Sequence, residues 1–401
     1  MIGGGAAGFY GAITAAQHGL QRILILEKSK EVLTKVRISG GGRCNVTHDC
    51  LDPRELVKNY PRGHRSLNGP FSRFNATDTI AWFQEQGVTL KTEADGRMFP
   101  SSNSSATIVN CLTSTAQDLG IEVLTRTKVA SLQGDNNDYQ ILLADGGTLS
   151  ASHILIATGG LRSKEGQATV TTTGHQFSSP VPSLFTFPID DQRLADLQGV
   201  SVPNASVTAF KHTMQGPLLI THWGLSGPAI LRLSAWGARD FADCAYQFLL
   251  TVNWTGIKNA SEVEAILSAE RQAHGTRSVA KRSLIPGITN RFWSHLCEAA
   301  EITSTQTWAN LTKSQTQNLL AQLTSAAFQV TGKSTNKDEF VTCGGIHLKD
   351  LNLKTMQSKA HPGLYFAGEV LDIDGITGGF NFQAAWTTGH LAGKAIAEGQ
   401  E

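Results

Sequence analysis

The stretch Gly3-Gly-Gly5-Ala-Ala-Gly8 has the spacing GxGxxG and runs into a segment with helical character, Ala6 to His18. Glycines at these positions permit a tight turn, close approach of the backbone to a pyrophosphate, and close packing of the helix on a sheet. The N-terminus of the helix would face the phosphate charge. The pattern therefore predicts the dinucleotide-binding turn of a βαβ unit, with Ala6 and Ala7 inside it.

The strand expected after this helix ends in an acid. Arg22 to Glu27 has the apolar character of a buried parallel strand, and Glu27 follows Gly8 at the usual spacing of about 20 residues. A carboxylate at this place accepts hydrogen bonds from ribose hydroxyls and repels a 2′-phosphate. Only Met1 and Ile2 stand where the strand before Gly3 is expected, which indicates a truncated or misassigned start.

Net charge and cysteine content narrow the class of partner. The 401 residues include 34 Lys and Arg against 33 Asp and Glu, so no field of one sign favours nucleic acid or an anionic membrane. No apolar run approaches the roughly 18 residues that span a bilayer, and no signal sequence is recognisable. The six cysteines have neither CxxC nor metal-ligand spacing. We expect a soluble, cytoplasmic protein with a small-molecule substrate, reduced thiols and no metal site.

The pattern of helices and strands predicts an α/β fold with an insertion. Helices and strands alternate up to residue 158, whereas strand-like stretches and then helical ones fill residues 190–340. A buried strand at 363–368 and a helix at 381–398 return to the first domain. We expect a Rossmann-like domain formed by residues 1–189 and 341–401, an inserted β domain formed by 190–256 and 325–340, and a helical subdomain at 257–324.

Three longer motifs go beyond glycine spacing: SGGGRCN (Ser39 to Asn45), THWGLSGP (Thr221 to Pro228) and GLYFAGEVLDIDGITGGFNFQAAWTTG (Gly363 to Gly389). With them the chain closely resembles the BaiN-like, or aminoacetone-oxidase-like, family of FAD-dependent flavoproteins over almost its whole length. The resemblance implies a two-dinucleotide-binding-domain flavoprotein fold, with a β-barrel-like domain and a helical domain inserted in the FAD domain. Since no His or Cys lies in a flavin-linking motif, we expect FAD to be bound non-covalently.

The resemblance also implies which residues bind the cofactor. Glycines of the first turn would hold the pyrophosphate, Glu27 the adenosine ribose, and Ser39 to Asn45 the flavin or its phosphates, with Arg43 as counter-charge. Glu369 and Asp372 would meet the ribityl chain, and the turn before the last helix would lie beside the ring, although a plain surface turn is the alternative. The full expected set is Gly3, Gly5, Ala6, Ala7, Gly8, Glu27, Lys28, Ser39, Gly40, Gly41, Gly42, Arg43, Cys44, Asn45, Val129, Thr158, Gly159, Gly160, Gly368, Glu369, Asp372, Gly378, Gly379, Phe380, Asn381 and Gln383.

Two cysteines near the second glycine run raise the question of a redox dithiol. Flavoprotein disulfide reductases use CxxxxC, whereas five residues separate Cys44 from Cys50. The spacing therefore favours ordinary thiols over a dithiol pair.

The reaction that we expect is hydride transfer between the flavin and a small organic substrate. Thr221, His222 and Ser226 are candidates for the substrate side, although Gly224, Gly227 and Pro228 are also typical of a purely structural turn. No second GxGxxG follows a strand, so NAD(P)H would have to dock transiently as the reductant. An amine oxidase that uses oxygen and a non-catalytic flavin-binding module remain as alternatives.

Overall fold

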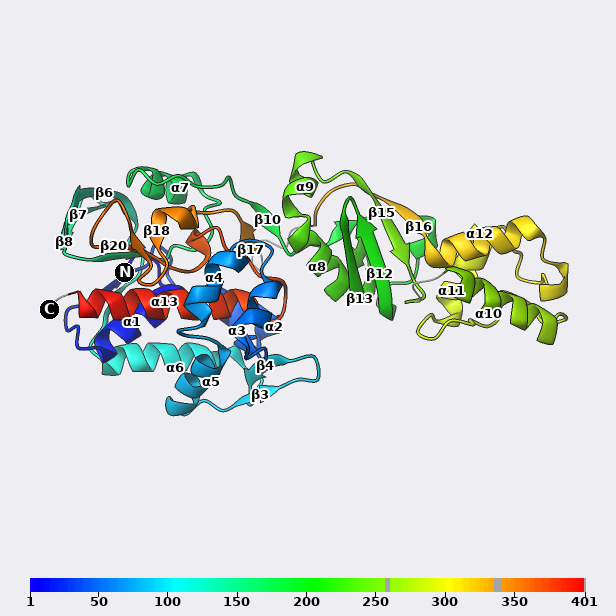
Figure 1. The fold of residues 1–401 in the computed structure, drawn as a ribbon, viewed down its shortest axis with the longest axis horizontal. Coiled ribbons are helices and arrows are strands. Elements are labelled where there is room, and N and C mark those ends of the chain that lie inside the picture. The colour runs from blue at the N-terminus through cyan, green and yellow to red at the C-terminus, as the bar shows by residue number, and fades with distance from the viewer. Residues whose placement is uncertain (257–259, 335–340, 400–401) are drawn as a thin grey trace. The chain divides into compact units, whose positions relative to one another are not determined.

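The computed structural model describes residues 1–256, 260–334 and 341–399. The chain divides into two compact units, one formed by Met1–Ser183 and Asn336–Glu401 and the other by Leu184–Thr335 (Figure 1). The domain boundary expected after residue 189 lies close to the break after Ser183. The boundaries expected at 256/257 and 340/341 adjoin residues 257–259 and 335–340, which lie outside the described residues. The expected β domain and helical subdomain both fall in the second unit, and their separation stays a prediction.

A parallel sheet of short strands forms the centre of the first unit. β1 (Leu24–Leu26) pairs in parallel with β5 (Glu122–Leu124), and β9 (Ile154–Ile156) pairs in parallel with β20 (Leu364–Phe366). Ile2 bridges both Leu26 and Ile156, so this one residue joins the two pairs of strands. Beyond β20 the sheet continues with the antiparallel strands β19 (Gln357–Ser358) and β18 (Leu351–Asn352).

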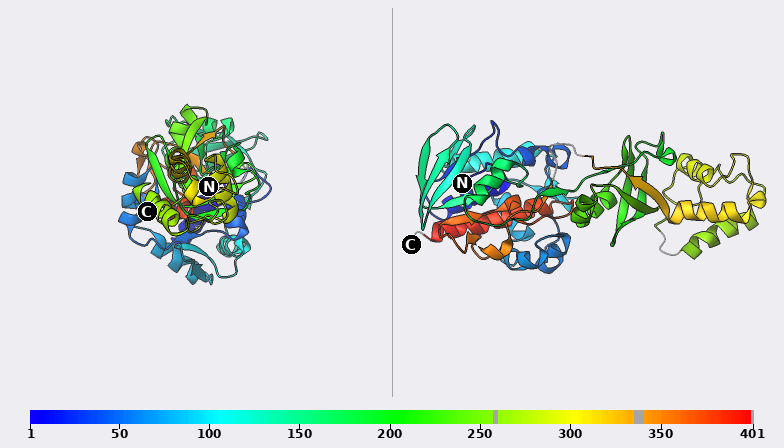
Figure 2. Two further views of the ribbon diagram at one scale, coloured as in Figure 1. Left: turned by 90° about the vertical axis from the view of Figure 1, so that its right-hand side faces the viewer. Right: turned by 90° about the horizontal axis from the view of Figure 1, so that it is seen from above.

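Helices from the two ends of the chain pack against each other in this unit. They are α1 (Ala6–Gln17) and α13 (Phe380–Glu398) (Figure 1). Their close approach depends on glycine, because a Cβ atom at Gly393 would lie 2.1 Å from the carbonyl oxygen of Gly11. Figure 2 shows α13, in red, from a second direction. The packing brings the glycine turns at the two ends of the sequence into one region.

The remaining elements of the first unit surround this helix pair. A hydrophobic core that includes Tyr10, Trp82, Val109 and Trp386 joins α1 and α13 to α5 (Ala76–Glu85) and α6 (Ser105–Asp118). The capping box of Asn75 and Asp78 fixes the start of α5. The other elements are α2 (Thr34–Gly42), α3 (Pro53–Leu56), α4 (His64–Phe71), α7 (Lys164–Thr171), η1 (Val57–Asn59), η4 (Leu348–Asp350), η5 (Gly368–Val370), β2 (Thr47–His48), β3 (Leu90–Thr92), β4 (Arg97–Pro100), β6 (Val129–Asp135), β7 (Asp138–Leu143), β8 (Thr148–Ala151), β10 (Val181–Ser183) and β17 (Val341–Cys343).

The second unit is centred on an antiparallel sheet with the strand order β11-β14-β13-β12-β15-β16. Its edges meet, because Thr331 N donates to Pro188 O at 3.1 Å and Thr186 bridges Ser334. The sheet therefore curls into the barrel-like form that the family resemblance implied. The elements are β11 (Phe187–Pro188), β12 (Ser201–Ala209), β13 (His212–Thr221), β14 (Gly224–Ser226), β15 (Phe248–Asn253), β16 (Ala326–Val330), α8 (Pro228–Trp236), α9 (Ala238–Asp243), α10 (Ala260–Ala273), α11 (Asn290–Ala299), α12 (Lys313–Thr324), η2 (Gln192–Leu194) and η3 (Trp308–Asn310). Among the residues that the structure describes, no helix has the length and apolar character needed to cross a membrane.

Candidate functional site

The glycine turn before α1 has room for a phosphate at the N-terminus of the helix. Gly3 has φ +108°, and a Cβ atom there would lie 2.4 Å from the carbonyl oxygen of Ala157. A Cβ at Gly8 would lie 2.0 Å from the carbonyl oxygen of Gly3. At Gly5, by contrast, a Cβ would meet no atom within 4 Å, and no side chain caps the helix that starts there. The residues present therefore fit a pyrophosphate that approaches Gly5 and the first N–H groups of α1.

The carboxylate of Glu27 lies beside the same turn, at the end of β1. Its Oε2 accepts a hydrogen bond from Gly4 N at 2.8 Å, and its Oε1 accepts one from Ser29 N at 2.8 Å. These bonds orient the carboxylate, while each oxygen keeps a lone pair that a ribose hydroxyl can use. Thr127 N donates to Glu27 O at 2.8 Å, which brings the start of β6, with Val129, close to the same place.

Three consecutive glycines interrupt α2 and expose its backbone. Gly40, Gly41 and Gly42 have φ angles of +59°, +68° and +82°, a left-handed conformation that other residues rarely adopt. A Cβ atom at Gly41 or Gly42 would meet nothing within 4 Å. The hydroxyl of Ser39, just before the run, donates to Val36 O at 3.0 Å. This surface offers peptide groups to a ligand, and contact with the flavin or its phosphates stays a prediction.

The side chain of Arg43 is engaged within the protein. Its Nη1 donates to Glu93 Oε1 at 2.6 Å, and its guanidinium group lies 4.0 Å from the centre of the Phe99 ring. The charge of Arg43 is therefore already balanced by a carboxylate of the β3–β4 hairpin. The expected use of Arg43 as a counter-charge for the cofactor stays a prediction.

Cys44 and Asn45 complete the same motif and point into the core. Burial raises the pKa of the Cys44 thiol to about 12, so this thiol is protonated at neutral pH. With its amide oxygen facing Gly379 N, Asn45 accepts a hydrogen bond at 3.0 Å and its amide nitrogen donates to Thr47 O at 3.0 Å. Asn45 thereby ties the SGGGRCN motif to the turn that opens α13.

The carboxylate of Glu369 lies beside the turn that follows β9. Its Oε1 accepts from Thr342 N at 2.7 Å, and its Oε2 pairs with Lys35 Nζ. A Cβ atom at Gly160 would lie 2.1 Å from Thr342 Oγ1, so the turn packs tightly at this point. Burial opposes the charge of Glu369, but Lys35 outweighs it and holds the pKa of the carboxyl below its usual value. Glu369 is therefore an anion that can accept a hydroxyl hydrogen bond.

Asn381 and Gln383 use their side chains inside the protein. The amide of Asn381 accepts from Gly375 N at 2.8 Å and donates to Gly375 O at 2.9 Å. Gln383 is fully buried, where it accepts from Thr47 Oγ1 at 2.6 Å and donates to Thr79 Oγ1 at 2.9 Å. Asn381 therefore stabilises the loop at Gly375, and Gln383 links two buried threonines. Direct contact of their amides with the ring stays a prediction.

What α13 offers a ligand at its N-terminus is its backbone. The helix follows Gly378 and Gly379, with φ angles of +132° and +93°, and its N-cap residue Gly379 has no side chain that could bind the helix N–H groups. The ring of Phe380 stacks on His48 with 4.7 Å between their centres. The N–H groups of the first turn form the positive end of the helix dipole, which suits an anion or a polarised ring edge.

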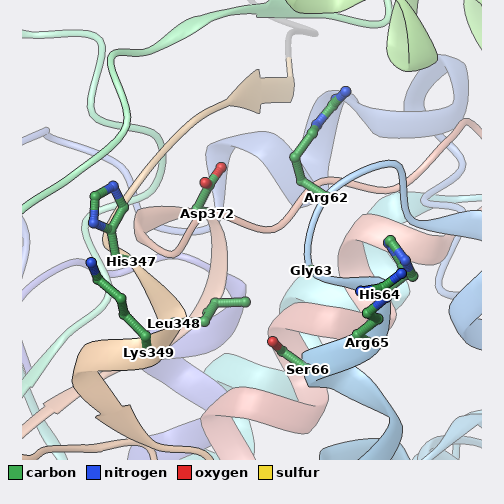
Figure 3. Close-up of a pocket in the computed structure, with 9 residues that line it drawn as sticks. All are labelled: Arg62, Gly63, His64, Arg65, Ser66, His347, Leu348, Lys349 and Asp372. Carbon is green, nitrogen blue, oxygen red and sulfur yellow. The ribbon is translucent and has the colours of Figure 1, made fainter.

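A pocket of about 390 Å³ opens in the first unit, between the start of α4 and the segments that carry His347 and Asp372 (Figure 3). Ser178 Oγ donates to Asp372 Oδ2 at 2.9 Å, whereas the buried Asp372 Oδ1 has no hydrogen-bond partner among the described residues. Arg62 pairs with the fully buried Asp374, whose pKa burial raises although Arg62 opposes that effect. The lining consists of Arg62, Gly63, His64, Arg65, Ser66, His347, Leu348, Lys349 and Asp372.

The candidates for the substrate side lie in the second unit. Thr221 ends β13, and its hydroxyl donates to Gly224 O at 3.0 Å. His222 is exposed in the turn, and Ser226 pairs with Leu219 in the sheet. The hydroxyl of Thr221 thus holds a tight hairpin, and a catalytic role for any of the three stays a prediction.

The structure places every residue of the expected cofactor set in the first unit, and their contact with FAD stays a prediction. It also adds residues that the motifs did not indicate. Lys35 pairs with Glu369, and Arg62 pairs with Asp374, each across more than 300 positions. Thr342 N is a further partner of Glu369. The first unit contains Gly3, Gly5, Ala6, Ala7, Gly8, Glu27, Lys28, Ser39–Asn45, Val129, Thr158–Gly160, Gly368, Glu369, Asp372, Gly378–Asn381 and Gln383.

Known proteins resemble this chain over its full length. A family model described as HI0933-like protein Rossmann domain matches residues 1–395. The chain is 29% identical to the ribosomal RNA dihydrouridine synthase of Escherichia coli, with 97% of this chain and 95% of that protein aligned. It is 27% identical to the 3-dehydro-bile acid delta(4,6)-reductase of Clostridium scindens, with 99% and 98% aligned.

Solved structures share the fold at low sequence identity. The 3-ketosteroid-delta4-(5alpha)-dehydrogenase of Rhodococcus jostii RHA1 has a TM-score of 0.52 at 13% identity and aligns with 99% of this chain and 95% of that one. The 3-ketosteroid delta1-dehydrogenase of Sterolibacterium denitrificans has a TM-score of 0.51 at 12% identity, with 99% and 98% aligned. The family match and these likenesses confirm the resemblance and the α/β fold that the sequence motifs predicted.

Proposed function

Because the chain belongs to the family described as HI0933-like protein Rossmann domain, we propose that this FAD-dependent oxidoreductase reduces a carbon–carbon double bond conjugated to a carbonyl group. One hydride would be added to the carbon farther from the carbonyl and one proton to the nearer carbon. The substrate gains two electrons and two hydrogens, and the flavin is oxidised. The substrate is proposed to be a small organic molecule.

The observation that carries the proposal is the chemistry that two relatives share. Dihydrouridine differs from uridine by two hydrogens across a ring double bond conjugated to a carbonyl group. A delta(4,6)-reductase that acts on a 3-dehydro bile acid saturates double bonds conjugated to the 3-keto group. Both names therefore denote reduction of the same kind of bond, and both proteins align with this chain over nearly their whole length.

The residues of the first unit fit the cofactor that such a reaction needs. When bound, FAD would supply the hydride from its reduced ring. Gly5 and the N-terminus of α1 would bind the pyrophosphate, and Glu27 would bind the adenosine ribose. Glu369, kept ionised by Lys35, would accept a hydrogen bond from the ribityl chain. The uncapped N-terminus of α13 would stabilise negative charge at the ring edge.

The reductant that reloads the flavin is proposed to be a dihydronicotinamide, NADH or NADPH. It would donate one hydride to the oxidised flavin, leave as the nicotinamide cation, and make room for the substrate. In this scheme each cycle consumes one NAD(P)H and one proton for each double bond that is saturated.

Anaerobic stopped-flow measurements test the proposal. The FAD-loaded protein is first reduced by light or by NAD(P)H and then mixed with a conjugated 3-ketosteroid or its saturated analogue. In a second arm the oxidised protein is mixed with a primary amine, and oxygen is admitted afterwards. Rapid reoxidation by the conjugated compound alone is expected. Reoxidation only by oxygen, with reduction of the flavin by the amine, would replace the proposal with the amine oxidase alternative.

A uridine in RNA is the second candidate substrate. The names of the Escherichia coli relative and of a Haemophilus influenzae relative, which is 29% identical over 99% of this chain, favour it. The near-neutral charge of the chain favours a small molecule instead. Ribosomal RNA from cells that lack such a modification belongs in the same stopped-flow series, and reoxidation by that RNA alone would select this candidate.

A further inference from the structure

The pocket of Figure 3 carries more positive than negative side chains. Its lining includes the basic residues Arg62, His64, Arg65, His347 and Lys349, against a single carboxylate, Asp372. Arg62 is committed to Asp374. Within residues 1–256, 260–334 and 341–399, the side chains of His64, Arg65 and Lys349 make no hydrogen bond or ion pair, and the buried Nδ1 of His347 has no partner. These groups are therefore free to bind a ligand.

Backbone N–H groups add to the positive character of the pocket. The helix α4 begins with His64, Arg65 and Ser66, all of which line the pocket, and no side chain caps it. Gly63 precedes the helix with φ +84°, and a Cβ atom there would lie 2.9 Å from Ile373 Cγ1. This position therefore requires glycine, which cannot cap the helix with a side chain. Together with the free cations, the helix terminus favours oxygens that carry negative charge.

The pocket is attached to the loop that opens α13. Arg62 pairs with Asp374, and Ile376 N donates to Asn59 O at 2.9 Å. The hydroxyl of Tyr60 donates to Phe380 O at 2.6 Å. Three links thus hold residues 59–62 against residues 374–380, the segment that the proposed function puts beside the flavin ring. The pocket therefore adjoins the loop that leads into α13.

We infer that this pocket binds an anionic oxygen group of the substrate, a phosphate or a carboxylate, as an attachment point separate from the double bond. Arg65 and Lys349 supply the charge, and the first turn of α4 supplies N–H donors. The inference rests on the proposed function, since it assigns a chemical class to that substrate. Among conjugated carbonyl compounds, those that carry an acid or a phosphate ester would then bind more tightly than their neutral counterparts.

Direct anion binding tests the inference without turnover. Inorganic phosphate and acetate are titrated calorimetrically, at constant ionic strength, into the FAD-loaded protein, whose cofactor already fills the pyrophosphate site. Comparison of the two titrations shows whether the pocket prefers phosphate or carboxylate. We expect saturable binding of at least one anion, weakened about tenfold by Arg65→Ala and again by Lys349→Ala. Arg73→Ala, at the far end of α4 and outside the pocket lining, is the matched control and should bind like the parent.

Kinetics with matched substrates provide the second readout. For a conjugated carbonyl compound with a carboxylate, the Arg65→Ala and Lys349→Ala variants should raise KM about tenfold and change kcat less than twofold. For its neutral methyl ester they should change neither constant. Absence of saturable anion binding in the parent, or equal weakening by Arg73→Ala, would overturn the inference. If no conjugated bond is reduced by the parent, the proposed function fails, while the calorimetry still decides what the pocket binds.

Discussion

The two glycine turns near the ends of the chain differ in which of their groups are available to a ligand. At the first turn, Gly5 faces open space and the helix offers its N–H groups, as the spacing of the glycines predicted. At the last turn, Asn381 and Gln383 were expected beside the flavin ring, but their amides bind Gly375 and buried threonines. The contrast teaches that glycine spacing predicts the shape of a backbone turn, whereas the partners of polar side chains depend on tertiary packing.

The largest expected effect is at Gly8. A Cβ atom there would lie 2.0 Å from the carbonyl oxygen of Gly3, so Gly8→Val must push α1 away from the turn. We expect loss of bound FAD and a substantial loss of thermal stability, measured by flavin content and by Tm. Stoichiometric FAD in a stable Gly8→Val protein would show that the first turn does not depend on this contact.

Gly5→Val sharpens the comparison, because it changes the space for the ligand and leaves the packing intact. A Cβ atom at Gly5 would meet no described atom within 4 Å, and the residue has an ordinary φ of −93°. We expect Tm of the cofactor-free protein to stay within a few degrees of the parent, while FAD affinity falls at least a hundredfold. A parallel fall in the stability of the cofactor-free protein would assign Gly5 to packing, and the phosphate site would lose its main support.

Substitutions at Asn381 test whether a charge at the N-terminus of α13 affects the flavin. Asn381→Asp adds a carboxylate at the N-terminus of α13, where a helix end stabilises a nearby anion by roughly 0.3–2 kcal/mol. We expect the two-electron potential of the bound flavin to fall by about 30 mV, which corresponds to about 1.4 kcal/mol. Asn381→Asp loses the bond donated to Gly375 O, and Asn381→Ala, which loses both bonds to Gly375 without adding charge, is the control. Equal potentials in a flavin-loaded Asn381→Asp protein and in the control would place the ring elsewhere.

The smallest expected effect concerns the two cysteines. Cys44 is buried with a pKa raised to about 12, whereas Cys50 is only partly buried. At pH 8 iodoacetamide should therefore modify Cys50 and spare Cys44 in the native protein, as read by peptide mass spectrometry. Cys50→Ser should change the rate of flavin reduction less than twofold. A tenfold loss, about 1.4 kcal/mol in the barrier, would restore the dithiol interpretation.

The features of the fold and site that could be predicted are those that have a local pattern in the sequence. The tight turns at Gly3 and Gly8 followed from glycine spacing. Ile2 could not be recognised as the link between two strand pairs, because a single bridging residue has no pattern. The partners of Glu369 and Asp374 were also missed, since Lys35 and Arg62 lie more than 300 positions away. Ion pairs of this kind depend on tertiary packing and leave no local trace.

A single-turnover product analysis tests the central claim most directly. The FAD-loaded protein, reduced without oxygen, is mixed with a limiting amount of a conjugated carbonyl compound, and the flavin spectrum and the product mass are followed together. The account predicts one saturated product, two hydrogens heavier than the substrate, for each flavin that is oxidised. Flavin oxidation without a saturated product, or a reduced flavin that persists with every conjugated compound and with ribosomal RNA, would contradict it.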